Sequence, residues 1–232
     1  FRDVDFCYGD AKEPSLSGIS LKVQPGQTVG VIGGTGSGKS TLVNLIPRFY
    51  DVFRGAVLVD GTDVRQWPLS ELRRRVGVVP QRAVLFAGSL RENMKGGRRD
   101  ATDEEIYQAL SIAQAKEFVD DKGEGLDLHI AQEGKNLSGG QRQRVGIARA
   151  LVLQPELVIC DEPVSALDVS VRSQVLNLLK DLQKEMNTSI LLITHNLGVV
   201  WEMCDTVMVM YAGNTVEYAD TKTLYQEPLH PY

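Results

Sequence analysis

The sequence predicts an α/β fold with a mostly parallel sheet, an antiparallel β subdomain at the start of the chain and an inserted α-helical subdomain. An alternating apolar pattern opens the chain, which is typical of half-buried strands. Short aliphatic runs without polar alternation follow, as expected for strands buried on both faces of a parallel sheet. A helix-rich stretch separates these runs and predicts the inserted subdomain.

The first segment is expected to form the antiparallel layer. "FRDVDFCYG" alternates along its length and places Val4, Phe6 and Tyr8 on one face. "ISLKV", residues 19–23, alternates again before the turn signal Pro25-Gly26. Two alternating runs joined over a short distance indicate antiparallel pairing.

Four aliphatic runs are expected to form the parallel sheet. They are "TVGVIGG" (28–34), "GVVPQ" (77–81), "LVICDE" (157–162) and "ILLITH" (190–195). Between the second and third runs, "TDEE" at 102–105 predicts a capping box at the start of a helix. A later helix is predicted over 171–186, followed by a hairpin around Gly213-Asn214.

These signals divide the chain into three parts. Residues 1–88 hold the antiparallel β subdomain and the first part of the core, and 89–153 form the helical subdomain. Residues 154–232 return to the core and end in the hairpin.

Composition excludes several classes of protein. Of 232 residues, 43% are hydrophobic and 24% are charged, as in ordinary globular domains. The net charge of -5 gives no reason to expect a nucleic-acid partner.

Three widely spaced cysteines lack the pairing of a zinc site and favour a reducing, cytoplasmic setting. The chain has no apolar run of ~20 residues and opens at Phe1, so we expect a trimmed or partial chain.

"GGTGSGKST", Gly33 to Thr41, fits the phosphate-loop pattern G-x-x-x-x-G-K-[ST]. It follows a buried strand and precedes an apolar-periodic helix, which is the context that the pattern requires. Glycines let backbone N–H groups surround an anion, Lys39 neutralises phosphates, and the Ser40 hydroxyl is a candidate Mg²⁺ ligand. The alternative is a flexible Gly/Ser loop.

Two neighbouring carboxylates follow the third aliphatic run, in "LVICDEPVSALD". A nucleotide site needs an acid near Mg²⁺ at the end of a neighbouring strand, so Asp161 is assigned to the metal. Glu162 is expected to point to the other side of an extended backbone, where it could polarise the attacking water. Taken alone, such a pair before a proline would be a surface turn.

"LSGGQRQRVGIARAL", residues 137–151, predicts a second anion-binding helix start with Ser138 as the N-cap. One phosphate loop already serves one nucleotide. The second helix start therefore calls for a second ligand or a second chain.

The phosphate loop, LSGGQ at 137–141 and the acid pair followed by "SALD" together resemble the nucleotide-binding domain of ATP-binding cassette (ABC) transporters. The resemblance implies a P-loop NTPase (RecA-like) fold and Mg²⁺-dependent ATP hydrolysis. It implies that Glu162, His195 and Gln81 are catalytic, and that Ser40, Gln81 and Asp161 hold Mg²⁺. It assigns the nucleotide contacts to Tyr8, Gly33, Gly36, Ser37, Gly38, Lys39, Ser40, Thr41, Ser138, Gly139, Gly140, Gln141 and Asp168.

Within that set, the resemblance gives particular roles to single residues. Tyr8 stacks on adenine, and Gln81 reaches Mg²⁺ and senses the membrane domain. His195 contacts the γ-phosphate, and Asp168 links two active sites. A lone histidine at a strand end, or an aromatic near a core, has more ordinary structural explanations on its own.

The resemblance also implies partners. Two copies close head to tail around ATP, so that Ser138, Gly139 and Gly140 of one copy face the γ-phosphate held by Lys39 of the other. A transmembrane domain of a transporter is the second partner, which places the chain at the cytoplasmic face of a membrane.

The two ends resemble different branches of the family. Segments such as "LIPRFYDVFRGAVLVDGTDV" resemble multidrug and lipid exporters, whereas "LVICDEPVSALDVSVRSQ" and "QEPLHPY" resemble oligopeptide and dipeptide importer ATPases. This pattern suggests a chimera or an engineered chain. Two alternatives follow: a folded ATP-binding scaffold with weak or no turnover, and a soluble ABC ATPase without a transport role.

Overall fold

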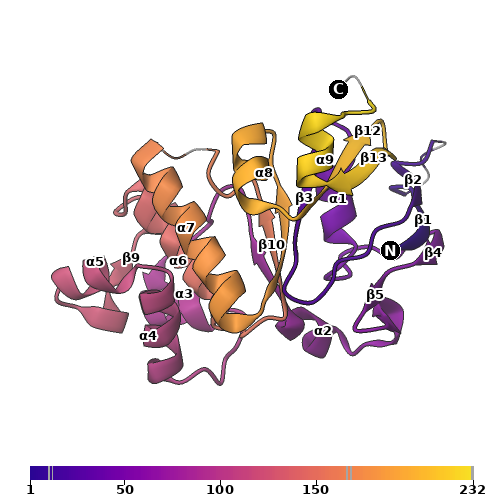
Figure 1. The fold of residues 1–232 in the computed structure, drawn as a ribbon. Helices are drawn as coiled ribbons and strands as arrows, with labels where there is room; N and C mark the ends of the chain where they lie inside the picture. The colour runs from indigo at the N-terminus through magenta and orange to yellow at the C-terminus, as the bar shows by residue number, and fades with distance from the viewer. Residues whose placement is uncertain (10, 12, 166, 168, 231–232) are drawn as a thin grey trace.

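The fold is taken from a computed structural model that describes residues 1–9, 11, 13–165, 167 and 169–230, apart from the side chain of Ser170 (Figure 1). Its centre is a six-stranded sheet in the order β13-β12-β3-β11-β10-β7. The strands span, in that order, Asn214–Asp220, Thr206–Tyr211, Thr28–Gly33, Ser189–Ile193, Leu157–Asp161 and Val76–Val79. Only the pairing of β12 with β13 is antiparallel within this sheet. The predicted α/β fold with a mostly parallel sheet is therefore confirmed.

The strands at the centre of the sheet are buried on both faces, as the continuous aliphatic runs predict. All six residues of β3 and all five of β11 are buried. Neighbouring residues of one strand pack into different cores: Ile159 joins one hydrophobic cluster, while Val158 and Cys160 join the other. Side chains alternate across a strand, so each face of the sheet has its own core.

The predicted antiparallel layer is present as a second sheet in the order β2-β1-β4. Its strands are Arg2–Phe6 (β1), Leu16–Ile19 (β2) and Arg54–Ala56 (β4). The strand predicted over 19–23 is wrong in its bounds, because β2 ends at Ile19. Beyond the assigned end of β2, Leu21 still exchanges two backbone hydrogen bonds with Phe1.

The described residues also form two short antiparallel sheets of two strands each. One pairs β5 (Leu58–Val59) with β6 (Thr62–Asp63), and the other pairs β8 (Gly88–Ser89) with β9 (His129–Ile130).

The helices lie on both sides of the central sheet, and α3 to α6 gather at the end farthest from β1 and β2 (Figure 1). The predicted capping box is confirmed, because the Thr102 hydroxyl accepts from the Glu105 N–H at the start of α4. The bounds are α1 Lys39–Asn44, α2 Leu69–Arg75, α3 Leu90–Lys95, α4 Asp103–Ile112, α5 Lys116–Asp121, α6 Gly139–Leu151, α7 Val169–Met186, α8 Leu197–Met203 and α9 Thr221–Gln226, with 3-10 turns at Val64–Gln66, Gly125–Asp127 and Gln132–Gly134.

The helix predicted over 171–186 is α7, and its apolar stripe faces the core: Val175, Leu178 and Leu182 are buried. In the described part of the chain, no helix combines the length and apolar character needed to cross a membrane.

Candidate functional site

The phosphate loop joins β3 to α1, as predicted. Gly38 precedes the helix with a φ of 98°, and a Cβ at this position would lie 2.7 Å from Leu16 Cδ2. Only glycine meets both conditions. Lys39 Nζ lies inside the loop and donates to the carbonyls of Gly33 at 2.7 Å and Gly34 at 2.8 Å.

Lys39 is also the cationic centre of the site. Burial lowers the pKa of this ammonium, and the nearby carboxylates Glu162 and Asp161 oppose that shift. A partly desolvated cation held by loop carbonyls is well placed to receive a polyanion, because phosphate oxygens would restore the charge balance.

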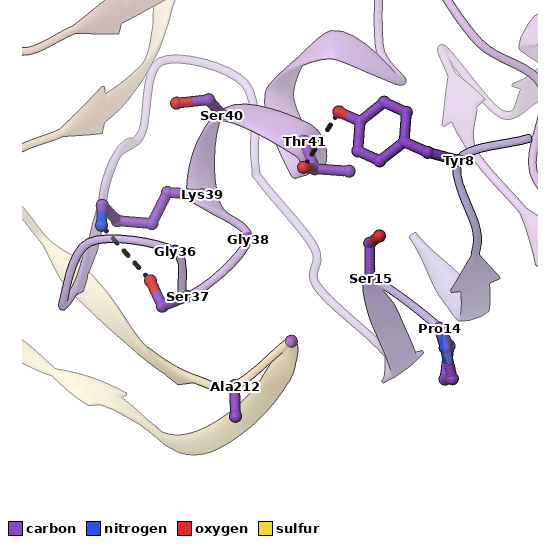
Figure 2. Close-up of a pocket in the computed structure, with 11 residues that line it drawn as sticks. Tyr8, Pro14, Ser15, Gly36, Ser37, Gly38, Lys39, Ser40, Thr41 and Ala212 are labelled. Atoms are coloured by element: carbon purple, nitrogen blue, oxygen red, sulfur yellow. Dashed lines mark hydrogen bonds between the residues drawn. The ribbon is translucent and has the colours of Figure 1, made fainter. Parts of the chain in front are cut away.

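A cavity of about 390 Å³ opens beside the loop (Figure 2). It is lined by Tyr8, Pro14, Ser15, Gly36, Ser37, Gly38, Lys39, Ser40, Thr41, Ala212 and Gly213. The cavity therefore combines an aromatic ring with a loop rich in backbone donors.

Tyr8 is held firmly at the wall of this cavity. Its hydroxyl donates to Thr41 Oγ1 at 3.0 Å. Its ring makes edge contacts with Phe6 and Tyr50, with centroids 4.8 and 5.1 Å apart. Tyr8 as a whole is 38% exposed, which leaves part of its surface free for a planar ligand.

Asp161 and Ser40 form the candidate metal position. Ser40 Oγ donates to Asp161 Oδ2 at 3.4 Å. Burial raises the pKa of Asp161, while the Ser40 hydrogen bond and the Lys39 charge lower it. In the described residues, no group of three or more His, Cys, Asp or Glu side chains could hold a metal unaided. This donor set fits Mg²⁺, which binds through one or two protein oxygens together with water and phosphate.

The Glu162 and Asp161 side chains have different partners, as predicted, but the backbone at Glu162 differs from the predicted one. The expected extended backbone is wrong: β10 ends at Asp161, and Glu162 has a φ of 47°. The Glu162 N–H donates to the Ile193 carbonyl at 2.9 Å, and this bond to β11 fixes the turn. The two acids nonetheless contact different partners.

The three predicted catalytic side chains lie together. Glu162 Oε1 is 2.9 Å from His195 Nδ1, and Glu162 Oε2 accepts from Gln81 Nε2 at 3.0 Å. The Gln81 amide also contacts the Ser165 hydroxyl at 3.3 Å. The Gln81 amide nitrogen is therefore directed at Glu162 and Ser165. The prediction that Gln81 shares Mg²⁺ with Ser40 and Asp161 is not tested by these contacts.

The LSGGQ segment lies at the start of α6, outside the cavity lining. As predicted, Ser138 is the N-cap: its hydroxyl accepts from the Gln141 N–H at 3.2 Å, and Gln141 Oε1 accepts from the Ser138 N–H at 3.0 Å. Ser138 and Gly139 are exposed. A Cβ on Gly140 would lie 2.9 Å from Val171 Cγ1, so this glycine lets α6 pack closely on α7.

Some site residues lay outside the prediction, and one predicted residue lies outside the described structure. Asp168 is not among the described residues. Pro14, Ser15, Ala212 and Gly213 line the cavity, and Ser165 contacts Gln81. Two of these residues carried a sequence signal: Ser165 begins the "SALD" motif, and Gly213 lies in the predicted hairpin turn. Neither signal indicated which residues they contact.

Together, the fold and the site define a P-loop NTPase. Residues 16–165 match the family model described as "ABC transporter", and the chain belongs to this family.

Three relatives illustrate the match. The chain is 42% identical over 217 residues to "Putative multidrug export ATP-binding/permease protein YgaD" of Bacillus subtilis, covering 94% of this chain and 37% of that protein. It is 40% identical over 227 residues to "ATP-dependent lipid A-core flippase" of Chromobacterium violaceum, covering 98% and 38%. A solved structure, "Structure of a bacterial Atm1-family ABC exporter with ATP bound", matches with a TM-score of 0.88 and 33% identity over 99% of this chain and 40% of that one.

The chain thus resembles exporter ATP-binding domains along almost its whole length, and it spans about two fifths of these relatives.

Proposed function

We propose that this chain binds ATP with Mg²⁺ and hydrolyses it, as the ATP-powered part of a membrane exporter. The observation that carries the proposal is the Glu162 carboxylate, held between His195 and Gln81 on the strand end next to Asp161. A fixed carboxylate next to a phosphate loop is what a hydrolase requires to direct water at a γ-phosphate.

Each residue of the site has a proposed part in this reaction. Lys39 and the loop N–H groups bind the phosphates, and Tyr8 stacks on the adenine ring. Ser40 and Asp161, with the side-chain oxygen of Gln81, would hold Mg²⁺. Bound there, Mg²⁺ supplies charge neutralisation of the phosphate oxygens. Glu162 orients the water and accepts its proton, while His195 fixes Glu162 and contacts the γ-phosphate.

The exposed start of helix α6 in the LSGGQ segment supports a composite site. Ser138 and Gly139 present a capped helix start at the surface, and this start lies outside the cavity of its own chain. We propose that a second copy docks head to tail, so that Ser138–Gln141 of one copy closes the nucleotide cavity of the other. Asp168 would then link the two sites.

Membrane partners are proposed from the relatives. The Bacillus subtilis relative carries "ATP-binding/permease" in its name, and this chain matches 37% of it. We propose that a transmembrane domain is the mechanical partner, and that the chain works at the cytoplasmic face of the membrane.

Substitution of Glu162 tests the proposal. Glu162→Gln keeps the shape of the side chain and removes the base, so hydrolysis should fall about 10²- to 10⁴-fold. ATP should then accumulate in a stable dimer that elutes earlier on size exclusion than the nucleotide-free chain. Unchanged hydrolysis with no ATP-dependent dimer would remove Glu162 from the role.

The mixed family pattern supports a second, narrower proposal. We infer that residues 157–232 derive from an importer-like ATPase and that the chain is a chimera joined near residues 138–151, because "LVICDEPVSALDVSVRSQ" and "QEPLHPY" resemble importer ATPases. Searching residues 1–136 and 157–232 separately against known proteins tests the idea, which is abandoned if both segments rank exporters first. In that case the alternative of a poorly active chimeric scaffold is also abandoned. Steady-state phosphate release measures directly whether the chain hydrolyses ATP.

A further inference from the structure

The hairpin between β12 and β13 lies beside the phosphate loop. β12 runs parallel to β3 with Met210 opposite Gly33, so both strands end at the same edge of the sheet. The turn residues Ala212 and Gly213 have φ values of 45° and 78°. Two left-handed residues in succession are typical of a tight hairpin turn. The turn therefore projects past the sheet where the phosphate loop begins.

Gly213 is wedged between two segments of the site. Its N–H donates to the Ser37 carbonyl at 3.1 Å, and its carbonyl accepts from the Ser17 N–H at 2.9 Å. Gly213 is buried, and a Cβ there would lie 2.6 Å from the Ser15 carbonyl oxygen. The hairpin thus ties the phosphate loop to the start of β2, and this position has no room for a side chain.

We infer that this hairpin positions the phosphate loop for nucleotide binding, and that Ala212 forms part of the wall facing the phosphates. The C=O and N–H of a trans peptide point in opposite directions. Fixing the Ser37 carbonyl on Gly213 therefore also fixes the direction of the Gly38 N–H, a backbone donor of the loop. The inference rests on the proposed function, because it takes ATP as the ligand of the cavity.

Ala212 is exposed and lines the same cavity as Lys39 (Figure 2). A charge placed at this position would act directly on a bound polyanion. Because the cavity is open to solvent, that effect should weaken as salt is added.

Two turn glycines offer a matched comparison for the loop contact. Gly61 has a φ of 74°, and a Cβ added there would have no atom within 4 Å, whereas Gly213 has nearly the same φ and a crowded Cβ position. Gly213→Ala and Gly61→Ala therefore share the backbone strain, but only the first disturbs the phosphate loop.

Calorimetric titration of the whole chain with ATP and Mg²⁺ should show the Kd of Gly213→Ala raised about three- to tenfold, the effect of one lost hydrogen bond. The KM should rise by a similar factor with a smaller change in kcat, and Gly61→Ala should bind as the wild type does.

A second pair of variants does not depend on Gly213→Ala folding. Asp and Asn both tolerate a positive φ, so Ala212→Asp and Ala212→Asn differ mainly in charge. ATP affinity of the Asp variant should be about tenfold lower than that of the Asn variant at low salt, and the gap should close as salt rises. Equal affinities for the two would overturn the inference about Ala212.

The outcomes separate this inference from the proposed function. If Lys39→Ala loses ATP binding while Gly213→Ala and Ala212→Asp match their controls, the hairpin has no positioning role and the proposed function stands. If the wild-type chain itself fails to bind ATP, both are overturned.

Discussion

His195 Nδ1 lies 2.9 Å from Glu162 Oε1, across the boundary between two neighbouring parallel strands. Glu162 follows the end of β10 and His195 follows the end of β11, while Gln81 follows β7 on the other side. Parallel strands bring their carboxyl ends to one edge, and there His195 and Gln81 both contact the Glu162 carboxylate. These residues should act as a unit rather than as independent contributors.

Loss of His195 tests this unit. His195→Ala should reduce kcat by about two orders of magnitude, because the attacking water loses a correctly held base. The double variant with Glu162→Gln should lose little more than the worse single variant. Steady-state phosphate release measures all three. If the fold-loss of kcat in the double variant equals the product of the two single losses, His195 and Glu162 act independently.

Tyr8 should contribute affinity through its ring rather than its hydroxyl. Removal of the ring in Tyr8→Ala should weaken ATP binding about 5- to 150-fold, on the scale of one base stacked on one aromatic. Tyr8→Phe keeps the ring and loses only the exposed bond to Thr41, so it should stay within a few-fold of the wild type. Titration with inorganic triphosphate provides the control, since a ligand without adenine should not distinguish the variants.

Ser138 has a structural part in capping α6 and a proposed part in the dimer, and substitutions can separate them. Ser138→Ala should cost about 1 kcal/mol of stability through the lost cap. Ser138→Asp keeps a capping oxygen but places a negative charge against the partner's γ-phosphate, so hydrolysis should fall while the melting temperature holds.

Mixing two inactive variants then tests the composite site. A head-to-tail pair of Lys39→Ala and Ser138→Asp chains contains one intact site, so their mixture should regain activity that neither variant has alone. A mixture as inactive as its components would contradict the shared-site arrangement.

Asp161 should make the nucleotide-free fold sensitive to pH. Burial raises the pKa of Asp161 above its ordinary value of 3.8. Between that value and the raised pKa, the folded protein binds more protons than the unfolded chain, so this group lowers stability as pH rises. Asp161→Asn should therefore melt a few degrees above the wild type at pH 7, with the advantage shrinking near pH 4. Calorimetric scans without nucleotide or metal measure the difference, and a destabilised Asn variant at pH 7 would refute this assignment.

The same variant should lose activity while it gains stability. The Asn side chain cannot provide the charge that Mg²⁺ needs, so Asp161→Asn should lose Mg²⁺-dependent hydrolysis.

The phosphate loop could be predicted in full because its chemistry lies within nine consecutive residues that join a buried strand to a helix. The parallel sheet could be predicted for a similar reason: strands such as β3 and β11 are buried throughout, and continuous aliphatic runs report that directly.

What could not be predicted depends on contacts between distant segments. Glu162 precedes a proline, which favours extended backbone, yet its φ is 47° because its N–H bonds to Ile193. The hairpin at Ala212 and Gly213 carries a clear turn signal, but its contact with Ser37 follows from how β12 aligns with β3. Neither the hydrogen bond from Glu162 to Ile193 nor the alignment of β12 with β3 can be predicted from the neighbouring residues in the sequence.

The strand that ends at Asp161 separates two cores, with Ile159 packed on one side and Val158 and Cys160 on the other. The position of the carboxylate is therefore a balance between two independently packed layers. A large-to-small substitution beneath either face should therefore disturb the packing that holds this strand end. The proposed activity should therefore respond to packing changes in either of two cores that share no buried residues, and a defect in one core could be compensated from the other.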